Sequence, residues 1–208
     1  TLCRTYWYPI YAFVRRRGHD RAEAEDLTQA FFARLLEGHC LSLVERGKGR
    51  FRSYLLATLE RFLVDEWRRA NRQVRGGGTR TLSFDGECAD ERYRVEPLDG
   101  MTAERIYERR WALTLLHQVL AALEREYLAG HRPALFERLK EYLLGEKSAP
   151  SYAQTAEEWG MTEEAVKAAV YRLRRRYREL LQFEVARTVS GPEEVEEELR
   201  ALFAALSE

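Results

Sequence analysis

The sequence has few of the residues from which disulfide frameworks, metal sites and membrane helices are built. Its 208 residues include three cysteines, Cys3, Cys40 and Cys88, which are widely spaced and form no C-x-x-C pair. An odd set of this kind fits a reducing compartment and excludes a disulfide scaffold or a cysteine-based zinc site. No apolar run approaches the roughly 20 residues that a membrane-spanning helix needs, and no signal peptide is visible. We therefore expect a cytoplasmic protein without metal, cofactor or membrane insertion.

Motifs of the common catalytic sites are also missing. The four histidines, His19, His39, His117 and His131, are scattered, and the sequence contains neither a G-x-S-x-G elbow nor a Walker glycine loop. The adjacent pair His39 and Cys40 has the residue types of a nucleophile and its base, but it has no partner residues to complete a site. The sequence therefore predicts a protein that is not an enzyme.

An excess of charge of either sign is absent, but the charges are unevenly distributed. Basic and acidic residues number 34 each, so the formal net charge is zero. Basic residues are concentrated in the segments 50–80 and 165–187, and acidic residues in the tail from Glu193 to Glu198. Net neutrality argues neither for nor against a polyanionic partner, whereas two basic segments provide places where such a partner could bind.

Apolar residues recur at three- and four-residue intervals along most of the chain, which predicts an all-α protein. The segment 73–102 breaks this pattern and contains Gly76, Gly77, Gly78, Gly86, Pro97 and Gly100. Such a long segment without periodicity is typical of a linker between domains. The sequence therefore predicts two helical domains, 1–72 and 103–189, a flexible linker at 73–102, and an acidic amphipathic extension at 190–208.

Two segments in the first domain have surfaces suited to a partner. The helix expected after Asp20 has its apolar stripe at Ala24, Leu27, Phe31 and Leu35. Asp26, Thr28 and Gln29 lie outside that stripe with Phe32 close by, which indicates either a docking surface or an ordinary solvated face. The helix expected at 49–72 carries rings and cations outside its apolar face: Arg50, Arg52, Tyr54, Arg61, Trp67, Arg68, Arg69 and Arg72. Cations and flat rings suit a nucleic-acid backbone and unstacked bases, and the alternative is a core helix with a solvated basic face.

The segment 151–181 has the spacing of a helix-turn-helix. Ala156 allows close helix packing, Gly160 permits a positive φ in the turn, and Val166 holds the second helix in place. Thr162 is placed to cap that second helix. The residues left for a partner are Lys167, Tyr171, Arg172, Arg174, Arg175 and Arg178. An ordinary helical hairpin is the alternative.

Together these segments resemble a bacterial RNA polymerase sigma factor of the extracytoplasmic-function group. Residues 1–75 look like the second conserved sigma region and residues 103–188 like the fourth. The resemblance implies a subunit that binds core RNA polymerase through the beta-prime clamp helices and the beta subunit. It also implies recognition and melting of promoter DNA, and control by a regulatory protein such as an anti-sigma factor or by the C-terminal extension.

The resemblance also assigns roles to residues. The segment 24–36 is similar to the one that binds the clamp helices, so Asp26, Gln29 and Phe32 are the expected polymerase contacts. The segment 49–69 matches the −10 region at Phe51, Tyr54, Leu55, Asp65, Arg68 and Arg69. The expected contacts with the −10 element are Arg50, Arg52, Tyr54, Arg61, Trp67, Arg68 and Arg69. Those with the −35 element are Thr162, Lys167, Tyr171, Arg172, Arg174 and Arg175.

Some positions depart from the family pattern. Arg61 replaces an Asn that many members carry in the promoter-melting helix, and Ala169 replaces a common Arg in the recognition helix. The glycines at 76–78 and the acidic tail are additions to the minimal pattern. Two alternatives to a sigma factor stay open. One is a stand-alone helix-turn-helix regulator that binds duplex DNA without polymerase, and the other is a helical adaptor that binds protein through Phe32 and the tail.

Overall fold

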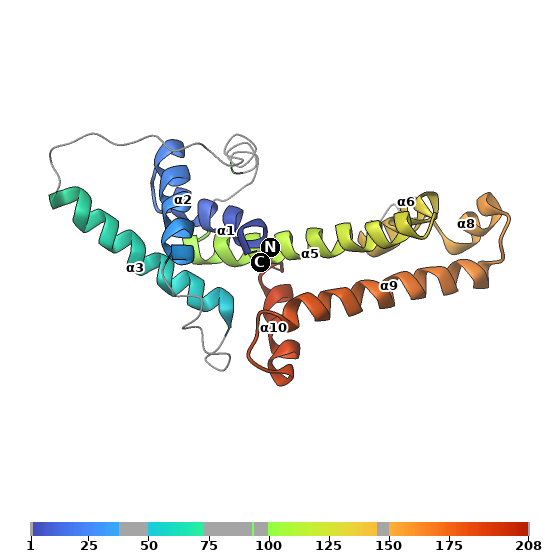
Figure 1. The fold of residues 1–208 in the computed structure, drawn as a ribbon. Coiled ribbons are helices and arrows are strands. Elements are labelled where there is room, and N and C mark those ends of the chain that lie inside the picture. The colour runs from blue at the N-terminus through green and yellow to red at the C-terminus, as the bar shows by residue number, and fades with distance from the viewer. Residues whose placement is uncertain (1, 38–49, 73–92, 94–99, 145–149, 208) are drawn as a thin grey trace. The chain divides into compact units, whose positions relative to one another are not determined.

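The computed structural model describes residues 2–37, 50–72, 93, 100–144 and 150–207 (Figure 1). Within these residues the regular structure is helical and contains no strand, which confirms the predicted all-α fold. Most of the expected linker at 73–102, the glycines at 76–78 and the pair His39 and Cys40 lie outside the described residues.

The helices group into two compact units. The first comprises residues 1–114 together with 186–208, and the second comprises residues 115–185. The units meet at 114/115 and at 185/186. The predicted domains have other boundaries, at 72 and 103. The beginning of the expected second domain and the whole expected extension belong to the first unit instead. The division into functional regions stays a prediction.

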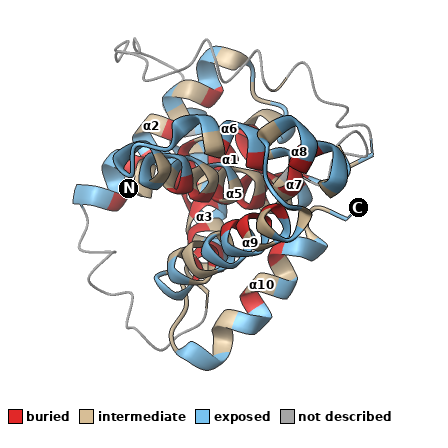
Figure 2. Ribbon diagram, turned by 90° about the vertical axis from the view of Figure 1, so that its right-hand side faces the viewer, coloured by how far each residue is buried: buried red, intermediate tan, exposed pale blue. Residues whose placement is uncertain are grey.

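The first unit is built from α1 (Leu2–Arg16), α2 (Arg21–Glu37), α3 (Phe51–Arg72) and the first part of α5 (Ala103–Ala129). The short helix η2 (Pro192–Glu194) and α10 (Val195–Ala204) complete it. Helix α1 is buried along most of its length between Thr5 and Val14 (Figure 2). It ends at Arg16, and Gly18 adopts a left-handed φ of 97° just after the basic last turn.

Helix α2 buries Ala24, Phe31 and Leu35 of the expected stripe, and more residues beside them. The side chain of Asp20 caps it, with Oδ1 accepting from the Glu23 amide at 2.9 Å. Thr28 is fully buried and Phe32 is only 5% exposed, whereas Leu27 is half-buried. Both α1 and α3 pack against α2, so it buries a wider face than a single stripe. Phe32 is thus a core residue, and its ring packs edge-on to that of Phe31 at 5.8 Å.

The second unit combines the rest of α5 with α6 (Pro133–Leu139), α7 (Glu141–Leu144), α8 (Tyr152–Trp159) and α9 (Glu163–Ala186). Its core consists of apolar side chains from all of these helices: Leu123, Phe136, Leu139, Tyr142, Ala156, Val166, Ala169, Val170 and Leu173. The segment 133–144 is divided at Lys140 into α6 and α7.

Helices α8 and α9 are joined by a short turn. Gly160 takes the left-handed conformation, with φ 61° and ψ 35°, and its amide donates back to the Ala156 carbonyl. Thr162 caps α9 as expected, because its hydroxyl oxygen accepts from the Ala165 amide at 3.2 Å. Ala156 and Val166 are both buried in the core of the unit. The turn therefore has the local geometry on which the helix-turn-helix prediction depends.

Candidate nucleic-acid interface

The expected nucleic-acid contacts on α3 differ in how accessible they are. Arg52 is only 4% exposed, and its Nε lies 2.7 Å from Oε1 of Glu198. Its guanidinium also lies over the ring of Trp111, 4.8 Å from the centroid, and pairs with Glu108 at 2.5 Å. The Tyr107 hydroxyl donates to the Arg52 carbonyl at 3.0 Å. Arg52 therefore reaches a nucleic acid only if its surroundings rearrange.

These neighbours keep Arg52 charged. Burial lowers the pKa of Arg52, but its hydrogen bond with Glu198 and the charges of Glu198 and Glu108 raise the pKa, and the result lies above the usual value. Arg50 pairs with the same carboxylate, its Nε lying 3.0 Å from Oε2 of Glu198, and also with Glu197 at 2.7 Å. The first turn of α3 is thus neutralised by the tail of the chain.

Further along α3 the expected contacts are accessible. Arg61, Arg68 and Arg69 are exposed, and the Trp67 side chain is 67% exposed. Arg69 pairs with Glu66 at 2.6 Å. Tyr54 is half-buried, and its ring stacks on that of Phe51 at 6.3 Å. The C-terminal half of α3 therefore combines an exposed ring with exposed cations.

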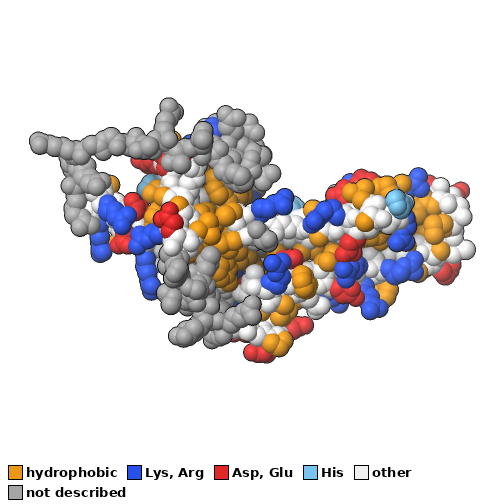
Figure 3. Space-filling model, viewed as in Figure 1, with side chains coloured by type: hydrophobic (Ala, Val, Ile, Leu, Met, Phe, Trp, Pro, Cys, Tyr) orange, Lys and Arg blue, Asp and Glu red, His pale blue; other side chains and the backbone are white. Residues whose placement is uncertain are grey.

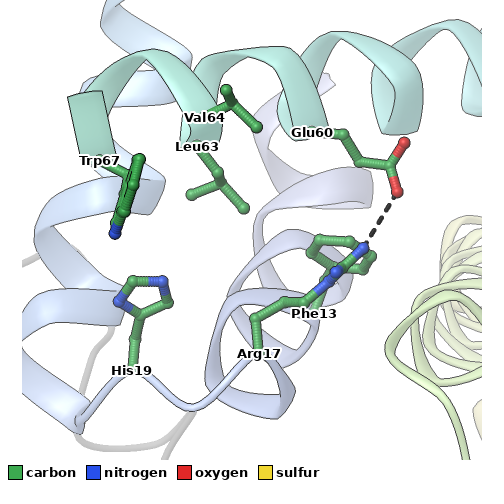
Figure 4. Close-up of a pocket in the computed structure, with 7 residues that line it drawn as sticks. All are labelled: Phe13, Arg17, His19, Glu60, Leu63, Val64 and Trp67. Atoms are coloured by element: carbon green, nitrogen blue, oxygen red, sulfur yellow. Dashed lines mark hydrogen bonds and ion pairs between the residues drawn. The ribbon is translucent and has the colours of Figure 1, made fainter.

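A pocket of about 380 Å³ adjoins this part of α3. It is lined from α3, from α1 and from the turn after α1, by Phe13, Arg17, His19, Glu60, Leu63, Val64 and Trp67. Figure 4 shows the Trp67 indole facing the His19 imidazole across the pocket, with the Arg17–Glu60 ion pair of 3.1 Å on the other side. The sequence did not identify Phe13, Arg17 or His19 as neighbours of Trp67, because no local pattern joins the two segments.

The expected polymerase contacts on α2 divide between surface and interior. Asp26 is exposed, and Gln29 is half-buried with a buried Nε2 that has no hydrogen-bond partner in the structure. Phe32 is in the core and offers no surface to a partner. A docking surface on this helix would thus consist of Asp26, Gln29 and their exposed neighbours.

The expected duplex-reading residues on α9 have acidic neighbours. Lys167 pairs with Glu163 at 2.7 Å and Arg175 with Glu179 at 3.0 Å. The hydrogen bond with Glu163, and its charge, raise the pKa of Lys167. Basic and acidic side chains are accordingly interspersed over this unit (Figure 3).

The remaining residues of this group have different surroundings. Tyr171 is 67% exposed, and Arg172 is exposed as well. Arg174 donates to the Tyr142 carbonyl, 2.8 Å from Nη2, and so binds the backbone of its own unit. The hydroxyl oxygen of Thr162 accepts the hydrogen bond that caps α9. Tyr171 and Arg172 are therefore both accessible to a partner.

Other kinds of site find no support in the part of the chain that the structure describes. No group of three or more potential metal ligands occurs among those residues. None of the described helices combines the length and apolar composition that a membrane crossing requires.

Comparison with known proteins identifies the first region of the chain. Residues 2–73 match the family model of sigma-70 region 2, a match that contains α1, α2 and α3. No curated protein and no solved structure matches the chain significantly. The matched region carries the expected polymerase and −10 contacts, and its family is not one of enzymes. The match supports a sigma factor of the sigma-70 family, a subunit that binds RNA polymerase and recognises promoters.

Proposed function

We propose that this sigma factor belongs to the extracytoplasmic-function group and opens promoter DNA with the C-terminal half of α3. The observation that carries this proposal is the exposed Trp67 on a helix with Arg61, Arg68 and Arg69. An exposed ring stacks on an unpaired base, which is worth about 1–3 kcal/mol per base. The cations hold the flanking phosphates, which positions the strand without specifying its sequence.

In this proposal α2 attaches the protein to the clamp helices of the beta-prime subunit through Asp26 and Gln29. Both residues lie within the region that matches the family model, and Asp26 is exposed. Extruding a base costs a few kcal/mol, comparable with the stacking gained, so opening requires the polymerase as well.

Helix α9 is the proposed reader of the −35 duplex. Its exposed Tyr171 and Arg172 follow a capped start and a tight turn, and an α-helix of this kind fits the major groove. Lys167 lies one turn earlier on an exposed position. Arg175 is exposed too, and we assign it to phosphate contact.

The test is in vitro transcription with core RNA polymerase, followed by measurement of strand opening. We expect Trp67→Ala to reduce opening of a promoter bubble, reported by permanganate reactivity of unpaired thymines, more than it reduces binding of duplex DNA. Leu128→Ala is a matched control, since Leu128 is a similarly exposed apolar residue on α5. Equal loss of opening and duplex binding, or duplex binding that needs no polymerase, would favour a stand-alone helix-turn-helix regulator.

A further inference from the structure

A buried carboxylate connects the end of the chain to the start of α3. Glu198 on α10 is 0% exposed, and its two oxygens lie 2.7 Å from Arg52 Nε and 3.0 Å from Arg50 Nε. Burying a carboxylate is costly unless it is paired and hydrogen-bonded. The two arginines provide that pairing, so the position of α10 depends on them.

A backbone hydrogen bond and a more exposed ion pair connect the same two segments. The Phe51 amide donates to the Thr188 carbonyl at 3.0 Å, which joins the first residue of α3 to the segment before α10. Glu197, whose side chain is 66% exposed, pairs with Arg50 at 2.7 Å. Leu202 is fully buried and anchors the next turn of α10. The tail thus belongs to the first unit through polar and apolar contacts.

The contact with α10 pairs two arginines, Arg50 and Arg52, that could otherwise bind the phosphates of a nucleic acid. Arg50 directly precedes α3 and Arg52 lies in its first turn, within the sigma-70 region 2 match, and the C-terminal half of the helix holds the exposed Arg61, Arg68 and Arg69. Arginine binds phosphate and carboxylate through the same fork of N–H donors. One guanidinium cannot hold both a tail carboxylate and a phosphate in that geometry.

We propose that the tail at 186–208 is an internal anionic competitor that covers the cationic start of α3 and is displaced when nucleic acid binds there. The proposal rests on the proposed function insofar as α3 is the helix that receives the DNA strand. It makes the covered conformation a resting state of the sigma factor. In the displaced conformation Arg50 and Arg52 add to the phosphate contacts made by the rest of the helix.

The experiment compares Glu198→Gln and Glu197→Gln with the parent chain in complex with core RNA polymerase. The probe is a labelled single-stranded oligodeoxynucleotide with a −10-like sequence, titrated at several salt concentrations. Each phosphate contact that is gained adds about 0.7 to the slope of log K against log salt for a single strand. We expect both variants to bind at least threefold more tightly, with a slope that is steeper by about 0.7 or more.

Glu196→Gln is the matched control, because it removes the same charge from an exposed position on the same helix. Affinities equal to that control would overturn the proposal. So would a gain in Glu197→Gln that persists when Arg50→Gln is added, since Glu197 pairs with Arg50 and its gain should require that arginine. If Glu198→Gln fails to fold, as circular dichroism would show, Glu197→Gln decides the question, since its side chain is largely exposed.

Failure of this proposal can be distinguished from failure of the proposed function. Loss of strand opening in Trp67→Ala tests the role of α3 in the parent chain, whatever the tail does. The tail variants test affinity and salt slope. A normal Trp67 effect with unchanged affinity in both tail variants overturns only the tail proposal.

Discussion

The guanidinium of Arg174 donates to the backbone carbonyl of Tyr142, with Nη2 at 2.8 Å and Nε at 3.3 Å. Tyr142 lies in α7, whose last carbonyls have no partner within so short a helix. An arginine expected to contact the −35 element thus caps a helix of its own unit.

We expect Arg174→Ala to lower the free energy of unfolding by about 1 kcal/mol, the usual contribution of one intramolecular hydrogen bond. Urea titration followed by circular dichroism measures this. Arg178→Ala is the control, because Arg178 is an exposed arginine one turn further along the same helix. Equal stability of the two variants would show that the contact with Tyr142 contributes nothing, and would leave Arg174 available for phosphate.

Gly160 is the turn residue between α8 and α9, and its φ of 61° lies in the left-handed region. A Cβ added there would meet no atom within 4 Å, so the backbone alone determines the cost of a substitution. We expect Gly160→Ala to destabilise the protein by about 1 kcal/mol and Gly160→Asn by less, since Asn tolerates this conformation. Thermal unfolding of the two variants beside the parent checks the order. If Ala is tolerated as well as Asn, the turn does not hold this conformation.

On α2, substitutions at neighbouring positions should impair different properties, polymerase binding in one case and stability in the other. Asp26→Ala combined with Gln29→Ala should weaken binding to core RNA polymerase while leaving the melting temperature nearly unchanged, because Asp26 is exposed. Phe32→Ala should cost about 3–5 kcal/mol of stability, because its ring is buried against Phe31. Co-elution with core enzyme and thermal unfolding separate the two effects. A stable Phe32→Ala variant with weakened polymerase binding would contradict the placement of Phe32 in the core.

Sequence patterns predict best those structural features that depend on residues close together in the sequence. The turn at Gly160 depends on residues a few positions apart and occurs as expected, and the end of α1 at Gly18 and the cap at Asp20 have equally local causes. The inward face of α2 was only partly predicted. Spacing alone does not say how many neighbours a helix has, and α2 has neighbours on two sides, so Thr28 and Phe32 are also buried.

In the candidate site, too, spacing along the chain does not reveal which residues a charged side chain contacts. Arg52 was expected at the surface, since arginine is seldom buried unless it is paired. Its partner Glu198 lies 146 residues further along the chain, so no spacing rule connects them. The exposed Trp67, Arg68 and Arg69 agree with their expected accessibility, because the end of a helix that projects from its neighbours remains solvated.

The second unit should lose stability in acid through one identifiable ion pair. Arg176 Nη2 lies 2.7 Å from Oε1 of Glu126, and this hydrogen bond, with the charge of Arg176, lowers the pKa of Glu126 below its usual value. A carboxyl whose pKa is lower in the folded state stabilises the fold above its unfolded pKa, near 4.5, and loses that contribution as the pH falls through the folded value. We expect the melting temperature to fall less steeply below pH 4.5 in Glu126→Gln than in the parent chain. Glu157→Gln, an exposed site in α8, serves as control and should keep the parent slope. Identical slopes in all three proteins would mean that the pair with Arg176 does not form in solution.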